Sequence, residues 1–172
     1  MSDWKTIYGP QWKAGAAREK YVYELIKKEF PELEIRLGHG AGRTDKIPYD
    51  PDHKRGAPDL FCYLNGEFLF QVEVTGTDQK ITDYIRIRPD KLEYALDARK
   101  NGKITWFYII YSHQDYVLET DFVEKYKDRI KERILYGRPE SYIEIPCHKI
   151  HPGNTYFILR LRELRRRKLF RE

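Results

Sequence analysis

The chain has 172 residues, a length that suits a single domain over residues 1–172 with a substantial core. Hydrophobic residues make up 41% of it and charged residues 34%, which fits a folded globular protein and excludes a disordered chain. No apolar run reaches membrane length, no signal peptide is evident and only two cysteines are present, so we expect a cytoplasmic protein without a disulfide framework.

The net charge of +5 is concentrated in residues 160–172, where seven Lys or Arg residues face two Glu residues. Such a segment suits a polyanion such as nucleic acid. The candidate contacts are Arg165, Arg166 and Arg167. The alternative is a terminal helix whose Ile158, Leu161 and Leu164 pack on the body. Scarce Asn, Gln and Met beside abundant Lys, Arg and Glu also suggest a thermophilic or archaeal source.

Hydrophobic periodicity predicts an alternation of helices and strands. In chain order, the predicted elements are a helix over 16–30, a strand over 34–37, a hairpin over 59–75, a helix over 89–101 with a capping box of Asp90 and Glu93, an interior strand over 103–112, a helix over 121–137, and strands over 142–146 and 155–161. A long polar loop over 38–57 and a polar connector over 76–88 separate them. This order indicates an α/β domain around a mixed sheet.

The predicted hairpin carries two acids, Asp59 and Glu73, in otherwise apolar strands. A carboxylate in such a strand is costly to desolvate unless something pairs with it, and a divalent metal ion is one such partner. The alternative is an edge hairpin with two solvated acids, because Pro58 is compatible with an edge strand.

The turn of this hairpin decides whether the two acids share a face. A two-residue turn at Asn65-Gly66 would leave both faces mixed, with Asp59 and Glu73 on opposite sides. A three-residue turn that also includes Leu64, with Gly66 left-handed, gives one apolar face and places both acids on the other. Because a buried face fixes the register, we predict the three-residue turn.

Pro58-Asp59 followed by Glu73-Val74-Thr75 on a hairpin resembles the motif of the PD-(D/E)XK nuclease superfamily, which includes many restriction endonucleases and archaeal Holliday-junction resolvases. The similarity covers about residues 15–111. It implies an α/β fold with a restriction-endonuclease-like core in the order α-β-β-β-α-β around a mixed sheet. Residues 112–159 would then form an extension with a helix and two strands, ahead of the basic tail.

The resemblance implies a metal-dependent endonuclease that hydrolyses DNA phosphodiester bonds, with branched or structured DNA as a candidate substrate. Asp59, Glu73 and the Val74 carbonyl would hold Mg²⁺ or Mn²⁺, which favour oxygen ligands. Glu19 matches a glutamate that completes the metal site in the resolvases, although it also fits a surface acid of the first helix. The resemblance also allows a homodimer.

The position of the motif lysine holds Thr75, which cannot supply an ammonium charge. Three explanations stay open. The lysine has moved to the second helix as Lys91, or Lys80 of the connector replaces it, or the domain binds or scaffolds nucleic acid without cutting it. In the nuclease interpretation, Arg43, Lys54 and Arg55 of the long loop would contact phosphates, and otherwise the loop is simply solvated.

Overall fold

The main sheet has five strands in the order β1-β2-β3-β5-β6, in which β3 and β5 are parallel and the other neighbours are antiparallel. The computed structural model describes residues 9–38, 57–77, 83–112, 114–135 and 137–170. The strands of the main sheet are β1 (Glu34–Leu37), β2 (Leu60–Leu64), β3 (Glu67–Thr77), β5 (Ile104–Tyr111) and β6 (Asp115–Glu119).

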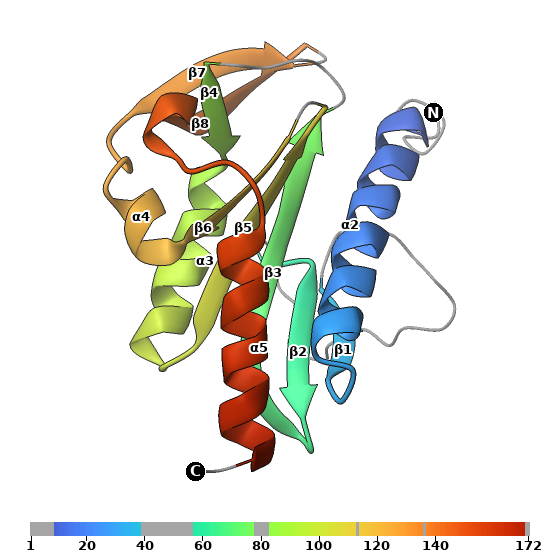
Figure 1. Cartoon of the computed structure of the whole chain (residues 1–172). Helices are drawn as coiled ribbons and strands as arrows, with labels where there is room; N and C mark the ends of the chain where they lie inside the picture. The colour runs from blue at the N-terminus through green and yellow to red at the C-terminus, as the bar shows by residue number, and fades with distance from the viewer. Residues whose placement is uncertain (1–8, 39–56, 78–82, 113, 136, 171–172) are drawn as a thin grey trace.

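A smaller antiparallel sheet, in the order β4-β8-β7, lies beside the main one. Its strands are β4 (Tyr84–Ile87), β7 (Ile130–Leu135) and β8 (Arg138–Pro146). The helices are α2 (Gly9–Glu29), α3 (Pro89–Lys100), α4 (Thr120–Glu124), α5 (Thr155–Phe170) and the 3₁₀ turn η1 (Cys147–Lys149). In Figure 1, α2 and α5 cover one face of the main sheet, and α3 with the smaller sheet lies on the other side.

Two apolar cores separate these layers, and β5 contributes to both. Tyr108 is buried among the residues beneath α2 and α5, whereas Phe107 and Ile109 are buried in the core that α3 and the smaller sheet cover. The predicted burial of this strand on both faces is therefore confirmed. The predicted core order is confirmed as well, as α2-β1-β2-β3-α3-β5 with β4 inserted before α3.

The β2-β3 hairpin has a different turn from the predicted one, but Asp59 and Glu73 still lie on the same face of the sheet. Leu64 pairs with Glu67 across a two-residue turn in which Asn65 and Gly66 have φ of 51° and 81°, so the predicted three-residue turn is wrong. A β-bulge then leaves Leu69 unpaired, since Tyr63 faces Phe68 while Cys62 faces Phe70. The bulge shifts the register by one residue and restores the predicted faces.

Two further predictions beyond residue 112 are wrong. The helix expected over 121–137 ends at Glu124, and residues 130–135 form β7 because β8 supplies their hydrogen-bonding partner. The strand expected over 155–161 is the start of α5, whose Phe157 and Leu161 are buried at helical spacing. Strands β4 and β6 were not expected, and α2 begins earlier than predicted.

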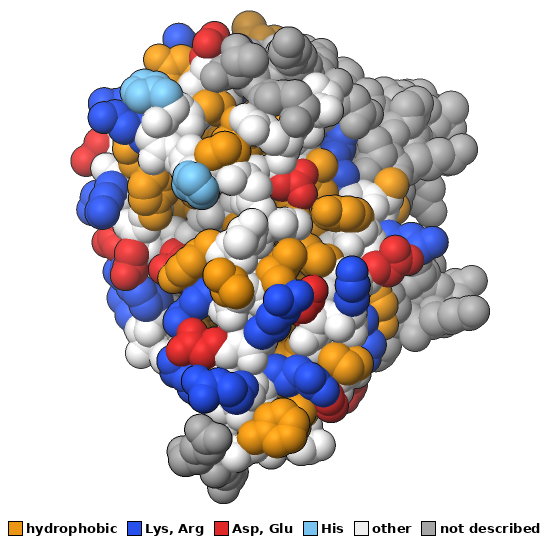
Figure 2. All heavy atoms as spheres, in the orientation of Figure 1, with side chains coloured by type: hydrophobic (Ala, Val, Ile, Leu, Met, Phe, Trp, Pro, Cys, Tyr) orange, Lys and Arg blue, Asp and Glu red, His pale blue; other side chains and the backbone are white. Residues whose placement is uncertain are grey.

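The basic C-terminal segment forms most of α5, which packs on the body with matched charges. Arg162 contacts Glu29 of α2 at 2.7 Å, and Lys168 contacts Glu67 of β3 at 2.9 Å. Figure 2 shows acidic and basic side chains interspersed over this face. None of the helices in the described ranges is long and apolar enough to cross a membrane.

Gly76 of β3 is required by the close approach of its partner strand. A Cβ atom there would lie 1.9 Å from the carbonyl oxygen of Ile110. Gly76→Ala should therefore lower the free energy of unfolding by about 2 kcal/mol or more, because backbone must move. Urea unfolding measures this loss.

The matched control is Gly15→Ala in α2, where a Cβ meets nothing within 4 Å. It should be neutral or stabilising by up to about 1 kcal/mol. A Gly76→Ala variant as stable as the original chain would contradict the observed strand packing.

Candidate active site

Asp59 and Glu73 lie on adjacent strands with their carboxyl groups buried on the same side of the sheet. Asp59 directly precedes β2 and extends its ladder, because its N–H donates to the Val72 carbonyl at 3.1 Å. Glu73 follows in the middle of β3. Only 6% of Asp59 and 8% of Glu73 is exposed. One Asp59 oxygen, Oδ2, accepts the Val74 N–H at 2.7 Å, which fixes the orientation of this carboxyl group.

Lys91 reaches this pair from the first turn of α3. Its Nζ lies 3.0 Å from Glu73 Oε2 and donates to the Ala57 carbonyl at 2.9 Å. Lys91 thus pairs with the buried Oε2 of Glu73 as a cation and as a hydrogen-bond donor, although this bond is not well aligned. Glu73 therefore retains an oxygen that can accept a further ligand.

Glu19 is the third acid near Asp59 and Glu73. It comes from α2, a helix on the face of the main sheet opposite α3. It is 9% exposed and shares a hydrogen bond with the Asp59 carboxyl group. Two carboxyl groups can share a hydrogen bond only when one of them holds a proton. As they stand, no three Asp, Glu, His or Cys side chains of the described residues are arranged to surround an ion. The site instead has the neighbouring carboxyl groups of Asp59 and Glu73, and the carboxyl group of Glu19 is hydrogen-bonded to that of Asp59.

Burial dominates the electrostatics of the two strand acids. It raises the pKa of Asp59 to about 6, against the opposing effects of the Lys91 charge, the Val74 N–H, Glu19 and the Arg88 charge. Burial, and then the charge of Asp59, raise the pKa of Glu73 well above its ordinary value, while Lys91 opposes the rise. Both acids therefore lack enough positive charge nearby, and one ammonium group does not compensate for two carboxylates.

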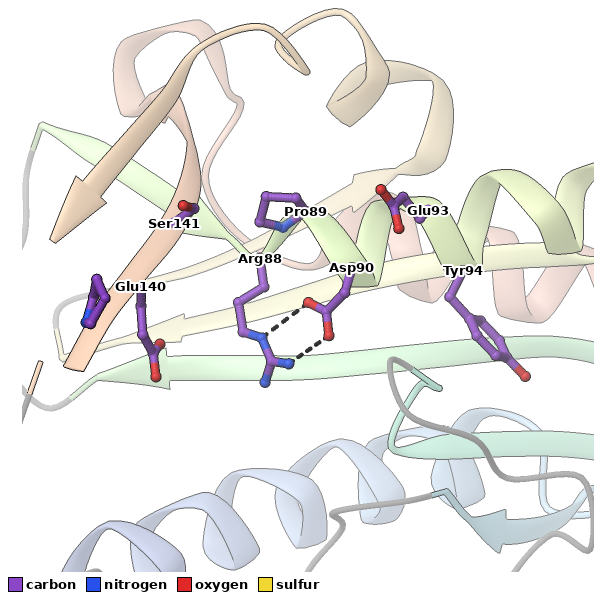
Figure 3. Close-up of a pocket in the computed structure, with 8 residues that line it drawn as sticks. Arg88, Pro89, Asp90, Glu93, Tyr94, Glu140 and Ser141 are labelled. Atoms are coloured by element: carbon purple, nitrogen blue, oxygen red, sulfur yellow. Dashed lines mark hydrogen bonds and ion pairs between the residues drawn. The ribbon is translucent and has the colours of Figure 1, made fainter. Parts of the chain in front are cut away.

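A cleft of about 720 Å³ opens between the start of α3 and β8. Figure 3 shows Arg88, Asp90, Tyr94 and Glu140 pointing to the same side of it. Arg88 forms a two-bond contact with Asp90, at 3.0 Å and 2.5 Å. The predicted capping box is therefore wrong, because Asp90 binds this arginine and no side chain caps the helix. Arg88 lies in the same helix start as Lys91, whose N–H donates to the Arg88 carbonyl at 3.1 Å, so the cleft adjoins the site.

The structure thus brings together Asp59, Glu73, Lys91 and Glu19, as the sequence predicted, and adds Arg88. The sequence did not point to Arg88, because residues 76–88 were predicted to be a connector. The available signal was the position of Arg88 directly before Pro89, at the start of a predicted helix. Thr75 is half-buried on β3. The predicted phosphate contacts Arg43, Lys54 and Arg55, and the alternative lysine Lys80, lie outside the described residues.

The structure does not bring the α5 arginines to this group. Arg165 pairs with Glu32 at 2.5 Å, and Arg167 pairs with Glu163 of the same helix. Arg166 belongs to the same helix, which covers the face of the main sheet opposite α3. A role of these three arginines in nucleic-acid binding stays a prediction.

No protein-family model matches this sequence, and no curated protein sequence matches it. Among solved structures, D212, a nuclease from a fusselovirus, has a TM-score of 0.50 at 19% identity, covering 87% of this chain and 92% of that one. Hjc of Archaeoglobus fulgidus, a Holliday junction resolvase from an archaeal hyperthermophile, has a TM-score of 0.47 at 12% identity, covering 88% and 99%. The likeness to D212, together with the strand order, shows a restriction-endonuclease-like α/β fold.

The raised pKa of Asp59 predicts a pH-dependent stability in metal-free buffer. The folded protein holds this proton until about pH 6, whereas the unfolded chain releases it near pH 4. The folded state binds more protons in this range, so the free energy of unfolding should fall as pH rises from about 4 to 6. Asp59→Asn should flatten that part of the profile.

Urea unfolding in EDTA at a series of pH values measures both profiles. Asp97→Asn, which changes an exposed acid on α3, is the matched control and should keep the slope of the original chain. An Asp59→Asn profile parallel to that of the original chain would contradict the assignment.

Proposed function

We propose that this protein is a metal-dependent endonuclease that hydrolyses phosphodiester bonds in DNA. The observation that carries the proposal is the pair of buried, undercompensated carboxyl groups, Asp59 and Glu73, beside the Lys91 ammonium group. A protein retains such a pair at a cost to its stability unless a cation joins it. The nuclease-like fold supports the choice of a phosphodiester as the substrate.

The residues present fit a hard divalent cation, Mg²⁺ or Mn²⁺. Glu73 Oε2 is a buried oxygen without a well-aligned hydrogen bond, and the donor set consists of carboxylates. Asp59, Glu73 and the Val74 carbonyl would hold the ion, with Glu19 as the additional carboxylate. When bound, the ion supplies positive charge that acidifies a bound water molecule and neutralises phosphate charge.

The chain's own residues position the reaction. The Val74 N–H holds Asp59 in one orientation, and the sheet fixes the spacing between the strands that carry the two acids. Lys91 would donate a hydrogen bond to the attacking water or to a phosphate oxygen, and its charge would stabilise the negative charge that develops there. This is the task of the motif lysine, which the neutral Thr75 hydroxyl cannot perform. Branched or structured DNA remains a candidate substrate.

One observation favours a second candidate, a nucleic-acid-binding or scaffolding domain without catalysis. Lys91 already provides Glu73 with a cationic partner at 3.0 Å, and Thr75 stands at the lysine position. In that case Lys91 would replace the metal ion structurally. The two candidates differ in a direct assay.

Cleavage of duplex, single-stranded and four-way-junction DNA with Mg²⁺ or Mn²⁺ tests the proposal. Asp59→Asn and Glu73→Gln should each lower the rate about 100-fold or more, since each removes a charge that acts on the reacting group. Lys91→Met should lower it comparably, whereas Lys100→Met, an exposed lysine at the other end of α3, should leave it unchanged. DNA binding by the original chain without any cleavage would establish the second candidate instead.

Metal binding can be measured without any reaction. Mn²⁺ at about 100 times its dissociation constant should stabilise the folded chain by about 2.7 kcal/mol, seen as a rise in melting temperature. Glu73→Gln should abolish the rise, and Lys91→Met should keep it, because that change leaves the carboxylates in place. A chain whose melting temperature does not respond to Mn²⁺ would contradict the proposed metal site.

A further inference from the structure

The smaller sheet turns one face toward the core that it shares with α3 and the other face away from it, because side chains alternate along its strands. Ile85, Ile143 and Ile145 lie in the core that this sheet shares with α3. The intervening positions form what we call the outer face: Tyr84, Arg86, Lys131, Arg133, Glu140, Tyr142 and Glu144. Arg86 is directly opposite Glu144, and Lys131 is directly opposite Tyr142, which places these side chains together.

The outer face has more positive charge than its acids neutralise. Arg86 and Arg133 flank the single carboxyl group of Glu144, at 3.9 Å and 3.8 Å, too far for hydrogen bonds. The Nε atoms of both arginines are buried and have no hydrogen-bond partner within the described part of the chain. Two guanidinium groups thus share one carboxylate, and it is the exposed part of each side chain, 24% for Arg86 and 39% for Arg133, that can meet an anion.

Neighbouring side chains extend this positive charge. Lys131 is exposed on β7, and Arg129, two residues earlier, is exposed as well. Glu140 lies opposite Arg133 and its Oε2 accepts the Tyr142 hydroxyl at 2.6 Å, so the three cations of the outer face stand against two acids. Two tyrosines, Tyr84 and Tyr142, accompany the cations, a combination that suits nucleic acid, where cations contact phosphates and hydroxyl groups donate hydrogen bonds.

The outer face is continuous with the candidate active site. Arg88, which lines the cleft, directly follows β4, the strand that carries Arg86 of the outer face. Glu140 of β8 also lines the cleft that Arg88 enters, as Figure 3 shows. A strand that leaves the active site along the cleft therefore meets the outer face next.

We propose that the outer face is the docking surface for the DNA backbone that flanks the cleaved phosphate. Phosphates contact Arg133, Lys131 and Arg86, and the next phosphate along enters the cleft at Arg88, where it competes with Asp90 for the guanidinium group. This proposal rests on the proposed function, because that function makes DNA the occupant. It assigns the DNA contacts to a surface away from the α5 arginines, whose Arg165 and Arg167 are paired with glutamates.

Fluorescence anisotropy of a fluorescein-labelled DNA duplex in EDTA, over a series of KCl concentrations, tests the proposal without cleavage. The Lys131→Ala/Arg133→Ala variant should bind about tenfold more weakly, and its slope of log K against log[KCl] should be smaller by roughly 2, as expected for two lost phosphate contacts. Lys131→Ala alone removes one exposed side chain and should reduce the slope by roughly 1.

The matched control is Lys100→Ala/Lys103→Ala, which removes the same charge at the far end of α3. It should bind like the original chain, and melting curves should show that all variants are folded. Unchanged affinity and slope in both Lys131 variants would overturn the proposal, as would equal losses in the control.

The two proposals fail separately when the same duplex is also incubated with Mn²⁺. Cleavage by the original chain with unchanged binding in the Lys131 variants would retain the nuclease and reject this surface. Binding that depends on Lys131 and Arg133 in a chain that never cleaves DNA would retain the surface and reject the nuclease.

Discussion

The central constraint in this structure is the burial of two carboxyl groups on neighbouring strands with one ammonium group beside them. Burial raises the pKa of both Asp59 and Glu73, the charge of Asp59 raises that of Glu73 further, and Lys91 provides one positive charge for the pair. Sheet and helix together hold this arrangement, since β2 and β3 carry the acids and α3 carries the lysine. The fold therefore maintains an electrostatic imbalance that a divalent cation would remove.

The sequence was sufficient to predict the two acids and the face that they share. It did not predict the combination of a two-residue turn and a β-bulge that places them there. Apolar alternation required Asp59 and Glu73 to lie on one side, and this is what the structure has. The turn follows local preference instead, because Asn65 and Gly66 both tolerate positive φ. The unpaired Leu69 allows both the two-residue turn and the shared face of the two acids. No residue pattern in the sequence indicates a bulge at this position.

The region after residue 112 was predicted less well because its structure depends on distant partners. Residues 130–135 have an apolar spacing compatible with a helix, yet they pair with β8 and form a strand. That pairing places Lys131 and Arg133 on one face, beside Arg86 of a segment that was read as a connector. The charge of α5 was conspicuous in the sequence, but Glu29, Glu32 and Glu67 of the body neutralise much of it.

The most direct test is a crystal structure of the chain soaked in Mn²⁺, with anomalous scattering used to locate the ion. We expect one Mn²⁺ bound by oxygens of both Asp59 and Glu73, with Lys91 turned away from Glu73 Oε2. An absence of Mn²⁺ at saturating concentration, with the Lys91 to Glu73 ion pair intact, would contradict it. The two acids would then belong to a structural ion pair, with no role in catalysis.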